Sequence, residues 1–238
     1  MKSVALIQPY FLPYFGYFQL IEYVDLVVLY DNVQYTKKGW INRNKIIRNG
    51  IVSNITIPLK KDSFSLNINE RYLSNNWPEY NQKILRQLSE SYEDSKNFKD
   101  VFNIVQLILD YNELRLDTFL MNSIKVICDY LEIKTDIISC SSIDSNSLNL
   151  KSSERVLNIL KKINCNKYVN PIGGKSLYKK NKFKKNDITL EFLNSTFNKN
   201  RINISEDNDK NKNLSIIDSM MNKSKDNLIK DLQSFILE

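Results

Sequence analysis

The chain has 238 residues, enough for one large domain, and its formal net charge is +7 at neutral pH. It contains no histidine, which excludes Ser-His and Cys-His nucleophile pairs, a histidine general base and the common zinc sites. We therefore expect no tightly held metal and no resident cofactor, and because lysines alternate with acidic residues we do not expect nucleic-acid binding.

The first part of the chain predicts a βαβ unit. The apolar run at 4–7 predicts a buried strand, a helix follows over 13–24, and the apolar run at 26–30 predicts a second strand. Strands that are apolar on both faces indicate a parallel sheet covered by helices. An Asn49-Gly50 turn then predicts a hairpin between 45–48 and 51–59.

The middle of the chain has helical periodicity from 77 to 131, which predicts a helical insertion of three helices. Further strands are predicted at 135–139, 167–170 and 189–193, with a helix over 152–163 and a loop over 171–174. This order predicts an α/β fold, Rossmann-like, with a mostly parallel sheet flanked by helices.

Three segments divide the chain in this prediction. Residues 1–197 form the α/β domain, 198–213 form a polar linker without apolar anchors, and 214–238 form a C-terminal amphipathic helix. We expect this helix to be an addition to the core, so that removal of the residues after 198 would leave the core folded.

Residues able to do chemistry follow the predicted strands, at the edge of the sheet where parallel α/β folds bind ligands. Gln8 follows the first strand, and its amide can orient a ligand. Tyr14 and Tyr17 bracket Gly16 at the start of a helix, where backbone N–H groups favour an anion. Pro9 stiffens the loop between the strand and the helix.

The segment after the second strand is rich in basic residues. Lys38 and Arg43 are candidates to hold phosphate or carboxylate, with an ion pair between Arg43 and Asp31 as the structural alternative. Trp40, next to Gly39, offers a ring for stacking on a base or sugar. Asp31 is the candidate base, or a carboxylate that orients a substrate amine. The other predicted binding residues here are Tyr35, Asn42 and Asn44.

The later strands lead into Ser142 and into a Gly173-Gly174 pair followed by Lys175-Ser176 and Tyr178. The spacing excludes a Walker motif, but two glycines can form a backbone anion nest or a simple turn. We predict that Ser142, Gly173, Gly174 and Tyr178 complete the binding site.

The cysteines and the hydropathy indicate a cytoplasmic protein. Cys128, Cys140 and Cys165 have no C-x-x-C spacing, so we interpret them as buried free thiols in a reducing compartment. Cys165 as a nucleophile would lack a histidine partner. The N-terminal apolar run is too short for a signal peptide, and no segment approaches the ~20 apolar residues that cross a bilayer, so we expect no membrane insertion.

The same motifs resemble the WbqC-like protein family. The resemblance is carried by Gln8-Pro-Tyr-Phe-Leu-Pro-Tyr-Phe-Gly-Tyr-Phe18, Lys38-Gly-Trp-Ile-Asn-Arg-Asn44 and Tyr168-Val-Asn-Pro-Ile-Gly-Gly-Lys-Ser-Leu-Tyr178, and it covers roughly residues 1 to 195. It implies a role in O-antigen or other surface-polysaccharide biosynthesis, with an enzyme that acts on an activated sugar. Transfer of an acyl or aminoacyl group to an amino sugar is one such reaction.

A weaker resemblance links Tyr14-Phe-Gly-Tyr17 to the H-x-G-H signature of nucleotidylyltransferases. Tyrosines replace both histidines, so the resemblance extends to the fold and to nucleotide binding rather than to nucleotidyl transfer.

Two functional hypotheses follow. The first is a transferase acting on a nucleotide-linked sugar, with the sugar nucleotide or an acyl or aminoacyl donor as its small-molecule partner. The alternative is a non-catalytic protein that binds a nucleotide-sugar or an acyl carrier protein, since an acidic carrier would suit the basic surface at 175–185.

Overall fold

A computed structural model describes residues 2–144, 150, 152–197 and 213–238, and it contains a six-stranded sheet in the order β5-β2-β1-β6-β7-β8. The first five strands in this order are parallel, and the short β8 lies antiparallel to β7 at the edge. The predicted α/β fold with a mostly parallel sheet is confirmed. The strands are β1 (Ser3–Ile7), β2 (Leu26–Leu29), β5 (Asp136–Ser139), β6 (Lys167–Pro171), β7 (Thr189–Ser195) and β8 (Phe235–Leu237).

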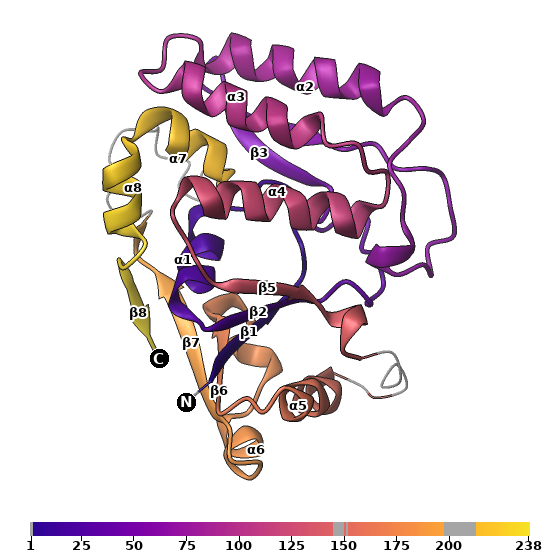
Figure 1. The fold of residues 1–238 in the computed structure, drawn as a ribbon, viewed down its shortest axis with the longest axis vertical. Helices are drawn as coiled ribbons and strands as arrows, with labels where there is room; N and C mark the ends of the chain where they lie inside the picture. Colours follow the sequence, from indigo (N-terminus) through magenta and orange to yellow (C-terminus); the bar gives the residue numbers. More distant parts are fainter. Residues whose placement is uncertain (1, 145–149, 151, 198–212) are drawn as a thin grey trace.

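Side chains alternate between two cores on the two faces of the sheet. Val4 and Leu6 pack against α5 (Ser152–Lys162) and α6 (Lys180–Lys184), whereas Ala5 and Ile7 belong to the core that contains α1 (Phe15–Tyr23) and α4 (Leu116–Tyr130). Figure 1 shows α4 and α5 on opposite sides of the sheet. Burial of both faces explains why these strands are apolar runs and not alternating ones.

The helical insertion and the hairpin lie beyond the α1 side of the sheet. The insertion contains α2 (Trp77–Tyr92), α3 (Phe98–Leu109) and α4, and the hairpin strands β3 (Arg43–Arg48) and β4 (Ile51–Thr56) form a separate two-stranded sheet. Asn49 and Gly50 have φ angles of 51° and 73°, the positive values that a two-residue hairpin turn needs. The predicted hairpin and insertion are confirmed, and α2 contacts β3, where the Ile47 N–H donates to the Tyr92 hydroxyl at 3.2 Å.

Most element boundaries differ from the predictions by one to three residues, and three of the differences bear on the site. α1 begins at Phe15, because the backbone is extended at Tyr14, its N-cap, so Pro13 precedes the helix instead of occupying its first turn. β2 ends at Leu29, one residue before the predicted end. The predicted loop over 171–174 contains the last residue of β6 and a short 3₁₀ helix, η3 (Ile172–Leu177).

The C-terminal residues form two short helices and a strand in place of the single predicted helix. α7 (Ile216–Asn222) ends where Lys223 becomes extended, and α8 (Lys225–Asp231) leads into β8. These elements are part of the core: Ile216 and Met220 are fully buried, and the Gln19 amide donates to the carbonyls of Asp231 and Ser234 at 2.8 and 2.9 Å. These contacts argue against a separable terminal helix, and the truncation described below tests this. Of the predicted linker, residues 198–212 lie outside the described residues.

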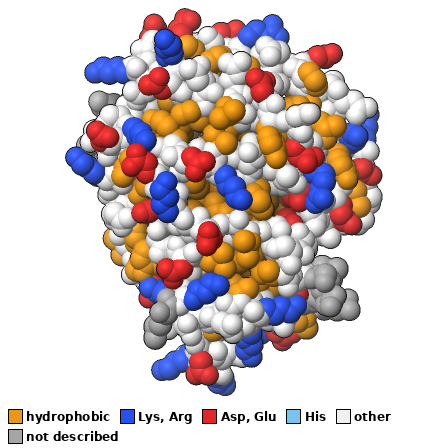
Figure 2. Space-filling model, in the orientation of Figure 1, with side chains coloured by type: hydrophobic (Ala, Val, Ile, Leu, Met, Phe, Trp, Pro, Cys, Tyr) orange, Lys and Arg blue, Asp and Glu red, His pale blue; other side chains and the backbone are white. Residues whose placement is uncertain are grey.

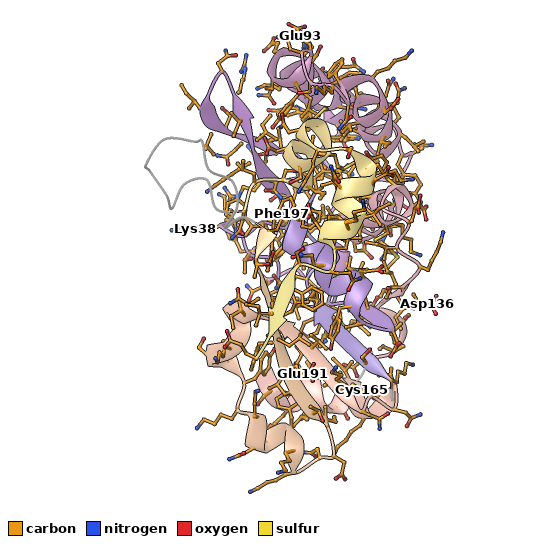
Figure 3. All side chains as sticks on the ribbon, turned by 90° about the vertical axis from the view of Figure 1, so that its left-hand side faces the viewer. Lys38, Glu93, Asp136, Cys165, Glu191 and Phe197 are labelled. Carbon is orange, nitrogen blue, oxygen red and sulfur yellow. The ribbon has the colours of Figure 1, made fainter. Side chains whose placement is uncertain are left out.

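The end of β7 also ties the sheet to α1. Phe197, which is labelled in Figure 3, stacks on Phe15 with ring centroids 3.8 Å apart. Ser215 caps α7 and its hydroxyl donates to the Leu12 carbonyl at 2.9 Å, so the C-terminal elements also hold the loop before α1.

Removal of residues 214–238 is expected to abolish cooperative thermal unfolding, because it exposes the buried face of α1 and removes the edge strand β8. Two point variants make the test quantitative. Leu228→Ala, at a fully buried position, should lower the free energy of unfolding by about 2–5 kcal/mol. Leu237→Ala, at a 37% exposed position, should change it by less than about 1 kcal/mol. A truncated chain that melts like the full chain would contradict this assignment.

Candidate functional site at the carboxyl edge of the sheet

The carboxyl ends of β1 and β6 flank the point where the strand order reverses. β2 and β5 lie on one side of β1, and β6 and β7 lie on the other. β1 pairs with β2 through four residue pairs, but with β6 only through Ser3↔Lys167 and Val4↔Tyr168. The last residues of β1 and β6 are thus not paired with each other. Open α/β sheets bind ligands at such a point, and we call residues 8–10 and 170–174 the switch-point edge.

Amide side chains lie on the α5 face of the switch-point edge. Gln8 and Asn170 share this face because they alternate with Ile7 and Val169, which belong to the opposite core. The Gln8 Oε1 accepts a hydrogen bond from Tyr10 at 3.4 Å, and the Asn170 Oδ1 accepts one from Tyr168 at 3.3 Å. The two predicted segments, after the first strand and after β6, therefore flank one edge of the sheet.

The Gly173-Gly174 pair packs against Asn170 through its second glycine. A Cβ on Gly174 would lie 2.1 Å from the Asn170 Nδ2, whereas a Cβ on Gly173 would have no atom within 4 Å. The side chain of Asn170 is 7% exposed, so it has little room to move away. Gly174 is thus needed for a close approach between η3 and β6. Tyr178, after η3, packs edge-on against Tyr168 at 5.7 Å.

Tyrosine hydroxyls lie on the α1 side of the same edge. Tyr17 donates to the Gln8 carbonyl at 3.0 Å, and its ring lies 6.0 Å from that of Tyr10. Burial raises the pKa of Tyr14 to about 12 and raises those of Tyr10 and Tyr17 as well. The phenols are therefore neutral hydrogen-bonding groups near pH 7. A Cβ on Gly16 would lie 2.9 Å from both Tyr14 Cε2 and Ser195 Cβ, so Gly16 lets α1 approach β7. Pro9 is buried directly after Gln8.

Asp31 lies at the end of β2 and is 1% exposed. Its carboxylate accepts from the Ser141 backbone N–H at 2.8 Å and from the Ser141 hydroxyl, which fixes the turn after β5. Burial raises the pKa of the nearby Asp117, and the negative charge of Asp31 raises it further. Ser142 is exposed, and its hydroxyl donates to the Ser139 carbonyl at 2.7 Å. Ligand contact by Asp31 or Ser142 stays a prediction.

A second candidate place lies farther along the segment after β2. It is a cleft of about 560 Å³, which we call the basic cleft. Tyr35, Asn42, Leu59 and Phe64 contribute to its walls. Its charged lining residues are Lys37, Arg43, Lys60, Lys61 and Arg71, with Asp62 as the one acid.

The amide side chains predicted to bind a ligand in this segment donate hydrogen bonds to backbone carbonyls. Asn42 accepts from the Tyr35 hydroxyl at 2.8 Å and donates to the Ile57 carbonyl at 2.7 Å. Asn44 donates to the carbonyls of Phe11 and Leu12 at 3.0 and 2.7 Å. The Asn44 contacts join the loop after β1 to the start of β3.

The predicted basic and aromatic residues have different surroundings. Arg43 donates to the carbonyls of Gly39 and Lys37, which orders the loop before β3, and no described residue forms an ion pair with it. Lys38 is exposed and projects at the margin of the molecule in Figure 3. Trp40 is 39% exposed and lies under the Lys45 Nζ, 5.1 Å from its ring centroid, so one face of the ring contacts a cation. The structural alternative of an Arg43–Asp31 ion pair is wrong, because the Asp31 carboxylate accepts hydrogen bonds from Ser141 instead.

The residues that were predicted to form one site therefore lie at two places in the structure. The segments after β1 and β6 flank the switch-point edge, Asp31 and Ser142 lie beside it, and Arg43 and Tyr35 line the basic cleft. Sequence analysis missed Arg71, which lies within hydrogen-bonding distance of the 60–63 segment because Leu59 and Leu73 form a bridge. No local pattern around Arg71 indicates this pairing.

The three cysteines are buried free thiols, as predicted. Burial raises the pKa of Cys165 to about 11 and those of Cys128 and Cys140 to about 12. They are therefore thiols and not thiolates near neutral pH, which argues against Cys165 as a nucleophile. Within the described part of the chain, no three His, Cys, Asp or Glu residues gather as a metal site would require. The described helices include none with the length and apolar character of a membrane span.

Comparison with known proteins identifies the family. The sequence model of the WbqC-like protein family matches residues 8–230, so the match includes α7 and most of α8, which the sequence resemblance had left out. The uncharacterized protein Rv1507c of Mycobacterium tuberculosis is 34% identical over 102 residues, which span 42% of this chain and 43% of that protein. No solved structure matches the chain.

The two adjacent glycines give a matched pair of variants. Gly174→Ala should lower the free energy of unfolding by about 1–3 kcal/mol, because its Cβ displaces the buried Asn170 amide. Gly173→Ala should change it by less than about 0.5 kcal/mol, because its Cβ points into open space. Urea unfolding measures both values.

A double variant supplies the control for this prediction. Asn170→Ala removes the atoms that clash, so Gly174→Ala should cost clearly less in that background. Equal effects of the two glycine substitutions in the native background would contradict the close approach.

Proposed function

Because the chain belongs to the WbqC-like protein family, we propose that it is a transferase acting on a nucleotide-linked sugar or on its amino substituent in O-antigen or other surface-polysaccharide biosynthesis. Acyl or aminoacyl transfer to the sugar amine is the reaction class. The observation that supports it best is the polar switch-point edge, where the unpaired ends of β1 and β6 present amides and phenols.

The chemistry of this edge suits a sugar. The amides of Gln8 and Asn170 can each donate and accept hydrogen bonds, and neutral phenols do the same. Such groups match hydroxyls and amides on a sugar ring better than they match a charged group. In this proposal, Gln8, Tyr10 and Tyr14 orient the sugar and its amine.

Backbone hydrogen bonds join the segments around the basic cleft to the same edge of the sheet. The Phe11 N–H donates to the Ile41 carbonyl at 3.0 Å, and the Asn69 N–H donates to the Asp31 carbonyl at 3.0 Å. We infer that a ligand with a polyhydroxyl end and an anionic end contacts both places. A nucleotide-linked sugar has both, with the exposed ring of Trp40 available near the loop for stacking.

The transfer itself needs little acid–base chemistry from the protein. The sugar amine attacks the carbonyl carbon of an acyl thioester, the carbon–sulfur bond breaks, and the amine proton leaves with the thiolate as a thiol. A phenol that stays protonated can donate a hydrogen bond to the carbonyl oxygen as charge develops on it. A chain without histidine is compatible with this reaction.

A second candidate function is non-catalytic binding of a nucleotide-sugar or an acyl carrier protein. The specific observation in its favour is Asp31, the predicted base, which is 1% exposed and bonded to Ser141. The lysine-rich segment of η3 and α6 follows the switch-point edge directly and would suit an acidic carrier.

The test combines nucleotide-linked amino sugars with acyl and aminoacyl thioesters and detects amide products by mass spectrometry. Gln8→Leu should lower kcat/KM by about 10-fold or more, because it removes the amide at the switch-point edge and keeps the side-chain volume. Gln82→Leu removes an exposed amide on α2 and is the matched control, with unchanged kcat/KM expected.

Three results are informative. Turnover that falls only in Gln8→Leu supports the transferase. Binding of a nucleotide-sugar without turnover by any donor supports the non-catalytic function. Absence of both binding and turnover contradicts the proposal.

A further inference from the structure

Among the described residues, two arginines are buried to the same extent. Arg71 and Arg155 are each 7% exposed, and each guanidinium lies over a tyrosine ring, 4.9 Å from Tyr35 and 5.0 Å from Tyr30 respectively. A buried guanidinium is costly unless an anion compensates its charge. Both arginines therefore need an anion nearby to compensate the charge of the buried guanidinium.

Arg155 has its anion inside the protein. Its Nε lies 3.6 Å from the Oδ2 of Asp144, a carboxylate that is fully buried, and Lys162 binds the other oxygen at 2.6 Å. The Nη2 of Arg155 also donates to the Asn32 carbonyl at 3.1 Å. The Arg155 Nε has no hydrogen-bond partner, as in Arg71, but a buried carboxylate lies beside the Arg155 guanidinium.

Arg71 has no such partner. Its Nη1 and Nη2 donate to the carbonyls of Ser63 and Lys60 at 3.0 and 3.3 Å, and its Nε has no hydrogen-bond partner. Two of the five guanidinium N–H groups are thus used, both by neutral acceptors. No carboxylate of the described residues forms an ion pair with Arg71.

The neighbours of Arg71 add to its charge. The other basic residues of the basic cleft form no ion pair with a described carboxylate either, and the one acid of the lining, Asp62, is exposed. In the wall of the cleft, Phe64 is 72% exposed, and the Lys37 Nζ lies 5.6 Å from its ring centroid. The cleft therefore combines an excess of cations with an exposed ring.

We propose that the basic cleft binds the diphosphate group of an organic phosphate, with Arg71 as its buried anchor. Several cations around one cleft favour a multiply charged anion over a single carboxylate, and the planar guanidinium matches phosphate oxygens. The identification of this diphosphate with that of a nucleotide-linked sugar rests on the proposed function. The anion site itself rests on the uncompensated charge of Arg71.

The probes are inorganic pyrophosphate, uridine diphosphate and malonate, with binding measured by calorimetry and by the rise in the thermal midpoint. The native chain should bind both phosphates, and Arg71→Met should weaken this binding by about 10-fold or more. Lys83→Met removes an exposed lysine of α2 outside the cleft and should leave the affinity unchanged. Because Arg71→Met also removes two internal hydrogen bonds, Lys61→Met, at an exposed position of the cleft, is the second variant. It should weaken binding by a smaller factor without loss of folding.

Each outcome decides the proposal. Equal pyrophosphate affinity in the native chain and in both cleft variants would overturn it, as would no binding of either phosphate. Tighter binding of malonate than of pyrophosphate would overturn the phosphate assignment. If the phosphates bind through Arg71 but no nucleotide-linked sugar binds, the anion site stands and the proposed function fails.

Discussion

The unequal pairing of β1 with its two neighbours determines where this fold can place a ligand. β1 is bound to β2 along its length but to β6 only at its amino-terminal end. Gln8, directly after β1, and Asn170, near the end of β6, are therefore not joined by the ladder. The close packing of Gly16 on Ser195 and of Gly174 on Asn170 then holds α1 and η3 against this edge. A Cβ at either glycine would clash with the neighbouring residue, Ser195 or Asn170. Neither glycine has a positive φ.

Charge compensation separates a structural site from a binding site in this chain. In the cluster of Asp144, Arg155 and Lys162 a buried carboxylate lies beside the Arg155 guanidinium, and the cluster joins α5 to the segment after β2 through Asn32. Arg71 is as buried as Arg155 and also lies over a tyrosine ring, but no described carboxylate forms an ion pair with it. On the face drawn in Figure 2, acidic and basic side chains are interspersed. The basic cleft differs from this face, because its lining holds five cations and one acid.

Local patterns in the sequence were sufficient to predict most helices and strands. They were insufficient to predict contacts between residues far apart in the chain. Apolar runs predicted β1 and β2, helical spacing predicted α2 to α4, and Asn49-Gly50 predicted the hairpin. β8 was missed because Phe235–Leu237 becomes a strand only by pairing with β7, and the apolar spacing of 214–237 also fits a helix. Asn44 was predicted as a ligand-binding residue, but its amide binds the carbonyls of Phe11 and Leu12, a long-range contact that spacing does not reveal. Arg71 was missed for the same reason.

We expect one ligand to contact both the switch-point edge and the basic cleft. Hydrogen–deuterium exchange of the native chain, with and without a nucleotide-linked amino sugar, tests this expectation. The ligand should slow exchange in peptides covering 8–14 and 170–178 and in peptides covering 59–71, with no change in the exposed face of α2. Slower exchange in only one of these two regions, or protection confined to other elements, would contradict it.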